Sequence, residues 1–446
     1  MTTFLLCANP LYGHVNPMLA IGRNLAARGD RVIVLTGSRF RAATTASGLE
    51  FRALHGSADF DERDPASFMP DTHRYKGIAL SQYQVESTFI RPIPDQWLSL
   101  SAILASETID AVLIDSLFAG ALPLLQQPAS DRPPVAAIGI GPLAQLSVDT
   151  PPFNSGIPMA AGAIARLRNR LLNVMARRVF FAHAQRFANR MILQAGGQRL
   201  GGFVIDLSRL PDRFLQLGPR EFEFARRDLS ANVRFVGTLP PTRSTGGEVP
   251  LPEWWDELAD GRPVVHVTQG TLDNHDLGMV IRPTIDALTD LDLHLVISTG
   301  RTPIDSVGSL PPNAHIAEFL PYDQLLPLCD LMVTNGGYGG TMAALSAGVP
   351  LVVAGAAEDK PEVAARVDYF GVGLDLHTGR PTAEQVGDAV QRILNDASFR
   401  EHATAMRAAI AGYDAFENIR TELDTMLTEQ NRSDTTTQTR QPKENG

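Results

Sequence analysis

Short, unbroken apolar runs recur along both halves of the chain, and each is followed by a stretch with helical periodicity. In the first half the runs cover 3–8, 31–36, 110–115 and 134–140. In the second half they cover 263–270, 293–300, 315–320, 331–335, 350–355 and 372–376. A strand that is apolar on both faces is typical of a parallel sheet buried between two layers of helices. The pattern therefore predicts an α/β fold with Rossmann-like, doubly wound domains.

Two such domains are expected, because 446 residues exceed what one core usually supports. A segment rich in Pro, Gly, Ser and Thr near the middle has the composition of a linker. We predict an N-terminal domain over 1–238, a linker over 239–252 and a C-terminal domain over 253–410. A last helix over 411–430 is expected to return to the N-terminal domain, and the polar residues 431–446 to be disordered.

The charge and the termini limit the classes of function. The net charge of -10 argues against nonspecific nucleic-acid binding, which requires a basic surface. The first ten residues lack a signal-peptide pattern, and only Cys7 and Cys329 are present, so a reducing cytoplasm is expected. The longest apolar stretch, 342–357, is interrupted by Ser346, Gly348 and Pro350, and we expect helix, turn and strand there instead of a membrane span.

The stretch TNGGYGGT, 334–341, places four glycines directly after an apolar run. Glycine lets the backbone approach a ligand closely, and the N–H groups at the start of a helix bind phosphates. The stretch is neither a Walker loop nor GxGxxG. Thr271, Thr299 and Phe319 follow other strands of the same half, at the sheet edge where ligands of parallel sheets bind. Together these residues predict a nucleotide site, with Phe319 offering a flat ring to the base.

The segment 319–367, FLPYDQLLPLCDLMVTNGGYGGTMAALSAGVPLVVAGAAEDKPEVAARV, resembles the nucleotide-sugar signature of family 1 (UDP-glycosyltransferase-like) glycosyltransferases, close to the bacterial macrolide-type branch. NPLYGHVNPMLAIGRNLAARGDRV and VVHVTQGT resemble the acceptor-side opening and the first C-terminal strand of the same family. The resemblance implies the GT-B fold, two domains facing a central cleft. It also implies inverting transfer of a hexose from a nucleotide sugar, with no metal and no cofactor beyond that co-substrate.

The resemblance also implies roles for individual residues of the donor site. Phe319 would stack on the base, with the backbone of Leu320 and Tyr322 beside it. The N–H groups around Tyr338 would hold the diphosphate, opposite Thr271, and Asp359 would grip the sugar. Two positions depart from the family pattern: Asn335 replaces a common His, and Lys360 replaces a Gln that contacts sugar hydroxyls. The full expected donor set is Thr271, Thr299, Phe319, Leu320, Tyr322, Asn335, Gly337, Tyr338, Gly339, Gly340, Asp359 and Lys360.

His14 is the expected general base for the acceptor hydroxyl. It is predicted in the loop just before the first helix, where the helix N-terminus disfavours a charged imidazole. Asp115 closes a strand and is expected to orient His14, as the second catalytic residue of the family does. Without the resemblance, a loop cap at His14 and a helix cap at Asp115 would explain the same residues. Two DxD stretches, 59–61 and 290–292, are expected to be solvated connectors.

The acceptor pocket is expected in the first half, and its apolar and aromatic content indicates a hydrophobic small molecule. Tyr12, Phe68, Tyr83 and Leu143 are its candidate residues. An amphipathic, Arg-rich stretch near 164–191 is either a solvated helix face or a peripheral membrane contact that loads a lipid acceptor.

The sequence therefore predicts an inverting O-glycosyltransferase that uses a UDP- or dTDP-sugar and acts on a natural product. A glycolipid-forming transferase, a sugar-nucleotide epimerase and a non-catalytic auxiliary protein remain alternatives. The sequence does not distinguish the donor base, the sugar, the acceptor or the oligomeric state.

Overall fold

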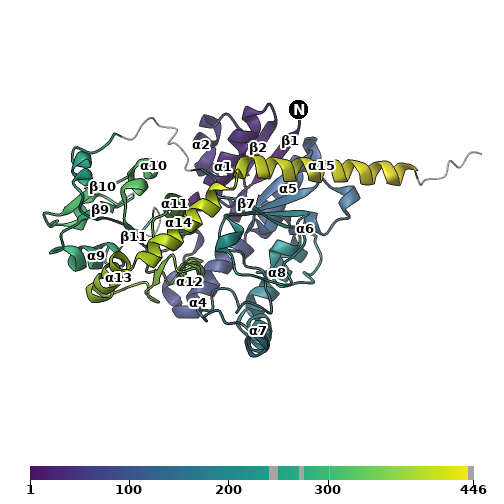
Figure 1. The fold of residues 1–446 in the computed structure, drawn as a ribbon. Coiled ribbons are helices and arrows are strands. Elements are labelled where there is room, and N and C mark those ends of the chain that lie inside the picture. The colour runs from purple at the N-terminus through teal and green to yellow at the C-terminus, as the bar shows by residue number, and fades with distance from the viewer. Residues whose placement is uncertain (241–249, 271–275, 301, 440–446) are drawn as a thin grey trace, which may run out of the picture.

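The computed structural model describes residues 1–240, 250–270, 276–300 and 302–439. They form two α/β domains, each built on a fully parallel sheet (Figure 1). The N-terminal sheet has the strand order β3-β2-β1-β4-β5-β6-β7, and the C-terminal sheet has the order β10-β9-β8-β11-β12-β13. Both orders are those of doubly wound Rossmann-like sheets. The predicted fold class is confirmed.

Most strands coincide with the predicted apolar runs, but three strands of the N-terminal sheet, Glu50–Ala53, Arg213–Leu217 and Val233–Gly237, were not among them, because each is interrupted by charged side chains. Those of the N-terminal sheet are β1 (Thr3–Cys7), β2 (Arg31–Thr36), β3 (Glu50–Ala53), β4 (Ala111–Asp115), β5 (Val135–Gly139), β6 (Arg213–Leu217) and β7 (Val233–Gly237). Those of the C-terminal sheet are β8 (Val264–Thr268), β9 (His294–Ser298), β10 (Ala314–Ala317), β11 (Leu331–Thr334), β12 (Leu351–Val353) and β13 (Gly373–Asp375). Every residue of the central strands β4, β5, β8 and β9 is buried, because helices cover both faces of each sheet.

The helices fill the layers on either side of the sheets. In the N-terminal domain they are α1 (Tyr12–Ala27), α2 (Arg41–Ala46), α3 (Pro65–Phe68), α4 (Gly77–Val85), α5 (Ile93–Ser106), α6 (Leu122–Leu125), α7 (Ala163–Met175) and α8 (Ala182–Gln194). In the C-terminal domain they are α9 (Ile281–Leu288), α10 (Tyr322–Leu325), α11 (Tyr338–Ala347), α12 (Lys360–Tyr369), α13 (Ala383–Asn395) and α14 (Ala397–Ala411).

The last helix, α15 (Ala415–Thr439), crosses back to the first domain (Figure 1). Its side chains Ile419, Leu423 and Met426 lie in the same buried cluster as Phe4 of β1. The helix runs on to Thr439, so residues 431–439 differ from the disordered tail expected there. Adding residues to an existing helix costs less free energy than starting a new one, so a helix can extend into a polar segment. Most of the predicted linker, 241–249, lies outside the described residues.

The carboxyl ends of the two sheets meet at the domain interface. Tyr338, in the first turn of α11, donates a hydrogen bond of 2.8 Å to the carbonyl of Leu217 at the end of β6. Gly218 is the residue that permits this contact, since it has a φ of +115° and a Cβ there would lie 2.2 Å from the Tyr338 hydroxyl. On α12, the fully buried Arg366 pairs with Glu223 of the first domain at 2.6 Å.

Glu223 is the centre of a buried charge cluster at this interface. It also pairs with Arg226 at 2.8 Å, and Arg366 pairs in turn with Glu362 at 2.8 Å. Burial alone would raise the pKa of Glu223, but Arg366 and Arg226 outweigh it and hold that pKa below its usual range. The cluster fixes α12, the helix that follows Asp359, to the N-terminal domain.

A buried histidine gives the C-terminal domain a measurable pH dependence. The ring of His266 on β8 bonds the Val296 carbonyl through Nδ1 at 2.9 Å and approaches the Tyr322 hydroxyl through Nε2 at 3.2 Å. Burial lowers the pKa of His266 from 6.5 to about 4. The neutral ring therefore stabilises the fold fully above pH 6.5, and this contribution is lost as the pH falls toward 4.

We predict that lowering the pH from 7 to 5 removes about 2 kcal/mol of unfolding free energy through His266 alone. Urea unfolding of wild type and His266→Asn at both pH values measures how steeply the unfolding free energy of each protein depends on pH. The matched control is His183→Asn, at an exposed histidine, which should keep the wild-type pH slope. Equal slopes for wild type and His266→Asn would contradict the assignment.

Candidate active site

Both sheets reverse their strand order at one point, and the predicted catalytic pair and the glycine stretch lie at these two points. In the N-terminal sheet the reversal lies between β1 and β4, and in the C-terminal sheet between β8 and β11. Ligands of open parallel sheets bind outside the strand ends at such reversals, because the helices there diverge to opposite faces. His14 lies in the segment after β1, Asp115 is the last residue of β4, and the glycine stretch follows β11.

His14 and Asp115 are in direct contact. His14 Nδ1 lies 3.0 Å from Asp115 Oδ1, and the two side chains are 13% and 0% exposed. His14 is in the first turn of α1, so the prediction that it precedes the helix is wrong. The helix begins at Tyr12 and accommodates Pro17 in its interior, so it starts earlier than a proline at the first turn would indicate. The ring also stacks on Phe89 at a centroid distance of 5.7 Å.

Asp115 is held by a buried polar network that sequence reasoning missed. Its Oδ2 accepts hydrogen bonds from the backbone N of Asn9 at 2.6 Å and from Asn9 Nδ2 at 3.1 Å. The Asn9 side chain accepts in turn from Gln96 Nε2 at 2.8 Å, and Gln96 accepts from the backbone N of Gly120 at 2.8 Å. Because Asn9 donates to the carboxylate from both its backbone and its side chain, the network fixes the orientation of Asp115.

The glycine stretch forms the N-terminus of α11. Gly337 is the residue before the helix, no side chain caps it, and Tyr338, Gly339 and Gly340 make the first turn. Among the described residues, a Cβ on Gly339 would meet nothing within 4 Å, so none of them fills the space above the first turn. The N–H groups of a first helical turn have no partner within the helix and attract anions. This end of α11 can therefore hold a phosphate group without a basic side chain.

Asn335 ties the glycine stretch to the neighbouring strand end. Its side chain is buried and donates a hydrogen bond of 2.6 Å to the carbonyl of Gln269, just after β8. The side-chain oxygen lies 3.9 Å from the position of a Cβ on Gly337. The structure thus shows Asn335 bracing the two loops at the strand reversal, a contact that the sequence did not predict.

Asp359 faces the N-terminal domain from the end that precedes α12. A Cβ on Gly141, just after β5, would lie only 2.9 Å from the Asp359 carboxylate. Burial raises the pKa of Asp359, as does the nearby Glu358, while Lys360 and His14 act in the opposite direction. Lys360 is buried and pairs with the exposed Glu358. Asp359 and His14 are thus close enough for their charges to interact across the domain interface.

The residues expected around the base lie at the far end of the C-terminal sheet. Phe319 is 49% exposed, as a stacking platform requires, while Leu320 is buried. The Tyr322 side chain points inward to His266, so only its backbone can face a ligand. The Thr299 hydroxyl donates to the Thr302 carbonyl at 2.6 Å within its own turn. Thr271, the residue expected opposite the glycines, lies outside the described residues.

The acceptor-side residues are all engaged in packing. Tyr12 packs against the core that includes α15, and Phe68 stacks on Phe60 at 4.3 Å. Tyr83 stacks on Tyr75 at 4.6 Å, and its hydroxyl accepts from the Asp71 backbone N. A role for these side chains toward an acceptor stays a prediction.

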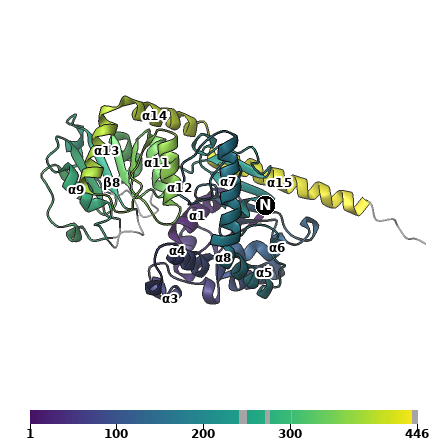
Figure 2. The same ribbon diagram turned by 90° about the horizontal axis from the view of Figure 1, so that it is seen from below.

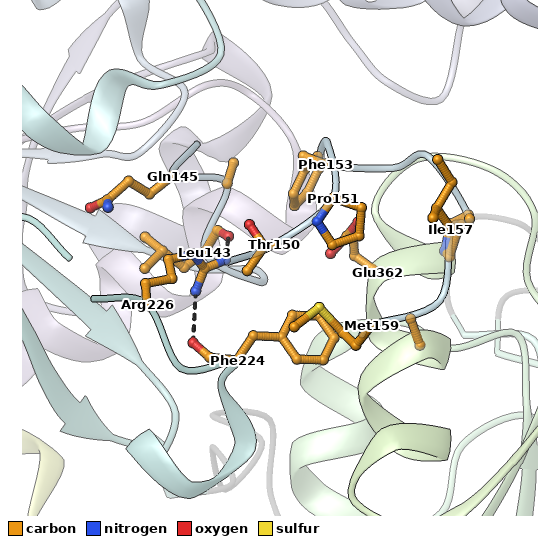
Figure 3. Close-up of a pocket in the computed structure, with 14 residues that line it drawn as sticks. Leu143, Gln145, Thr150, Pro151, Phe153, Ile157, Met159, Phe224, Arg226 and Glu362 are labelled. Atoms are coloured by element: carbon orange, nitrogen blue, oxygen red, sulfur yellow. Dashed lines mark hydrogen bonds between the residues drawn. The ribbon is translucent and has the colours of Figure 1, made fainter. Parts of the chain in front are cut away.

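Leu143 is buried and borders a small cavity between the domains (Figure 3). Figure 3 shows Met159 beside the Phe224 ring on the wall of this cavity, and Arg226 donating a hydrogen bond to the Phe224 carbonyl. The volume is about 20 Å³. This is room for about one water molecule, so the cavity cannot hold an acceptor.

The first DxD stretch, 59–61, is engaged in contacts within the N-terminal domain. Asp59 accepts from the Ser38 backbone N at 2.6 Å, and Asp61 pairs with Arg63. The Arg63 hydrogen bond holds the pKa of Asp61 down to about 2. In the described ranges, no three His, Cys, Asp or Glu side chains gather as metal ligands would.

Comparison with known proteins identifies the family. The family model described as "Erythromycin biosynthesis protein CIII-like, C-terminal domain" matches residues 282–426. UDP-glycosyltransferase 2 of Phaeomoniella chlamydospora is 36% identical over 433 residues, covering 94% of each chain. The chain belongs to the family 1 glycosyltransferases.

Further relatives agree with this assignment. The 4'-demethylrebeccamycin synthase of Lentzea aerocolonigenes is 36% identical over 412 residues, covering 92% of this chain and 96% of its own. Among solved structures, the kitacinnamycin glycotransferase superposes with a TM-score of 0.72 at 22% identity, covering 96% of this chain and 99% of its own. The glycosyltransferase thus has the GT-B fold that the sequence resemblance implied.

Two features of this glycosyltransferase escaped the sequence analysis for different reasons. Asn9 directly follows β1, so applying the strand-end rule to the first half as well would have found it. Gln96 lies within α5 and has no sequence signal, since only the fold brings it to Asn9.

Proposed function

We propose that this glycosyltransferase is an inverting, metal-independent O-glycosyltransferase that transfers a sugar from a UDP- or dTDP-sugar to a hydroxyl of a hydrophobic natural product. The observation that carries the proposal is the His14–Asp115 pair, placed at the strand reversal of one sheet and near Asp359 of the other domain.

The hydrogen bond between Nδ1 and the Asp115 carboxylate fixes the tautomer of His14. The carboxylate can only accept, so Nδ1 carries the proton and Nε2 keeps its lone pair. In the proposed step the acceptor oxygen attacks the anomeric carbon from the face opposite the leaving group. The hydroxyl proton passes to Nε2, the bond from the anomeric carbon to the diphosphate oxygen breaks, and its electron pair leaves with the diphosphate. Asp115 stabilises the imidazolium that results.

The start of α11 stabilises the departing diphosphate. Negative charge grows on the leaving group as the sugar departs, and the oriented N–H groups of the first turn are already in place to receive it. Fixed dipoles of this kind stabilise the negative charge of the diphosphate, a role for which other transferases use a cation. They do so in a chain whose own net charge is -10. Asp359, facing the same region, is proposed to bind hydroxyls of the donor sugar.

The donor and acceptor classes rest on the relatives. One relative is named a UDP-glycosyltransferase, and another is named a synthase of 4'-demethylrebeccamycin. The family model is named after erythromycin biosynthesis. These names support a nucleotide-sugar donor and a natural-product acceptor for this chain as well.

A thermal-shift panel tests the donor site. UDP, dTDP, GDP, ADP and NAD are each added with EDTA or with Mg²⁺. A ligand at about 100 times its Kd adds about 2.7 kcal/mol of stability, which moves the melting temperature by several degrees. We expect UDP or dTDP to give this shift equally in EDTA and in Mg²⁺. A shift seen only with NAD, or only with Mg²⁺, would contradict the proposed donor site.

A further inference from the structure

Helix α7 turns its polar side toward the protein and its apolar side toward solvent, the reverse of an ordinary surface helix. Its buried residues are Ala165 and Asn169, and it is attached to the domain through amides. Asn169 Nδ2 donates to the Val148 carbonyl at 3.2 Å, and Asn173 Nδ2 donates to the Ser147 carbonyl at 2.7 Å. A surface helix normally packs its apolar stripe on the core and turns its polar side outward. Here the polar stripe faces the protein.

The apolar stripe of α7 faces outward instead. Ile164 is 87% exposed, and Leu167 and Leu171 are each 60% exposed. Their spacing of three and four residues places them on one side of the helix, and the stripe continues through the π-helical turn Ala176–Phe180. We call this surface the α7 patch. Its exposed apolar residues are Ile164, Leu167, Leu171, Val174, Met175, Val179 and Phe180. The helix lies at the lower edge of the N-terminal domain in Figure 1 and on the near side of that domain in the view from below (Figure 2).

The surroundings of the α7 patch are strongly basic. The segment 150–205 contains no Asp and no Glu. Its eight arginines are Arg166, Arg168, Arg170, Arg177, Arg178, Arg186, Arg190 and Arg199. The eight arginines give this segment a net charge of +8. Since the whole chain carries -10, the rest of the chain carries -18, and the segment has the opposite sign of charge. Within the part of the chain that the structure describes, no salt bridge involves any of these eight side chains.

We propose that the α7 patch docks on an anionic phospholipid surface. An exposed apolar stripe flanked by arginines is what an interfacial helix needs, because the apolar side chains enter the acyl boundary while the cations meet the headgroups. In the described ranges, no helix is both long and apolar enough to cross a bilayer, so the contact is peripheral.

A second copy of the chain is the less favourable occupant. In a twofold dimer the same patch faces itself, so the arginines around one helix would oppose those around the other. A lipid surface supplies the opposite charge along the whole length of the helix.

The α7 patch lies next to the predicted acceptor side of the N-terminal domain. Gln82 of α4 donates to the Phe180 carbonyl, which joins the patch to the element that carries Tyr83, one of the predicted acceptor-side residues. An enzyme held at a bilayer by this edge meets apolar molecules where they concentrate. The inference rests on the exposed surface and does not depend on the proposed mechanism.

Vesicle flotation tests the docking site. The full-length protein is mixed with vesicles of 70% phosphatidylcholine and 30% phosphatidylserine, or of phosphatidylcholine alone, at low and high salt. We expect binding to the anionic vesicles that weakens with salt, and at least tenfold weaker binding to neutral vesicles.

Two sets of variants separate the apolar and electrostatic contributions. Leu167→Ser with Leu171→Ser should weaken binding at least tenfold, and so should Arg170→Glu with Arg177→Glu, because each charge near an anionic surface is worth about fivefold. The matched control is Leu98→Ser, at an equally exposed leucine on α5, which should bind like wild type. All four leucine and arginine positions are exposed, so melting temperatures should stay near that of wild type.

Three outcomes would overturn the proposal. They are absence of binding to anionic vesicles, equal binding to both vesicle types, and equal loss in the Leu98 control. A dimer in size-exclusion chromatography that the double Leu→Ser variant dissociates, without vesicle binding, would assign the patch to a second copy.

Discussion

Replacing His14 with alanine is expected to slow sugar transfer by about 10²–10⁴-fold, the usual contribution of a general base. The acceptor hydroxyl then has no group to take its proton, since the other member of the pair, Asp115, is fully buried and already accepts hydrogen bonds from Asn9 and Leu117. Nucleotide affinity should stay within about twofold of wild type, because the base acts on the acceptor and not on the diphosphate. Steady-state kinetics and calorimetric titration of UDP and dTDP measure the two effects separately.

The control for this substitution is His183→Ala, in the same domain. His183 is exposed and pairs with Glu86, whereas His14 pairs with Asp115. It should keep wild-type turnover, whereas His14→Ala should not. Unchanged turnover in His14→Ala would remove His14 from the mechanism, and an equal fall in nucleotide affinity would indicate a structural role.

Replacing Gly339 with aspartate is expected to weaken binding of the nucleoside diphosphate by at least about 100-fold. The new carboxylate would lie over the first turn of α11, where the diphosphate is proposed to bind. Like charges about 4 Å apart repel by about 4 kcal/mol at the effective dielectric of a protein surface. The substitution is sterically free, because a Cβ on Gly339 meets nothing within 4 Å. An acidic residue in the first turn also stabilises a helix by about 0.3–1 kcal/mol.

Gly339→Asp is therefore expected to raise the melting temperature slightly while abolishing binding, and these opposite signs distinguish lost recognition from lost folding. Gly201→Asp is the matched control, since a Cβ there also meets nothing within 4 Å and the residue lies outside the proposed site. Wild-type affinity in Gly339→Asp would place the diphosphate elsewhere.

The architecture was predictable because its signals are local. A continuous apolar run such as VVHVT predicts a fully buried parallel strand, and all five of these residues are buried in β8. The glycine stretch likewise gave both the end of β11 and the start of α11, because four closely spaced glycines have few other uses. The family assignment followed from the same segment.

Contacts between distant segments could not be predicted. Arg366 and Glu223 are 143 residues apart, and nothing in either local sequence indicates a buried ion pair between domains. The inversion of α7 has the same origin. Its amphipathic pattern was visible in the sequence, but the exposure of the apolar stripe and the inward hydrogen bonds of Asn169 and Asn173 appear only in the fold. The role of Leu143 toward an acceptor stays a prediction, because an apolar residue after a strand can line either a pocket wall or a core.

The anomeric configuration of the product tests the central claim most directly. The donor that stabilises the protein is incubated in EDTA with a panel of apolar alcohols and phenols, and the product anomer is assigned by the coupling constant of its anomeric proton. An α-linked donor should give a β-linked product with wild type, and none above background with His14→Ala. A product that retains the donor configuration, or a reaction that stops in EDTA, would contradict a single displacement driven by His14 and the N-terminus of α11.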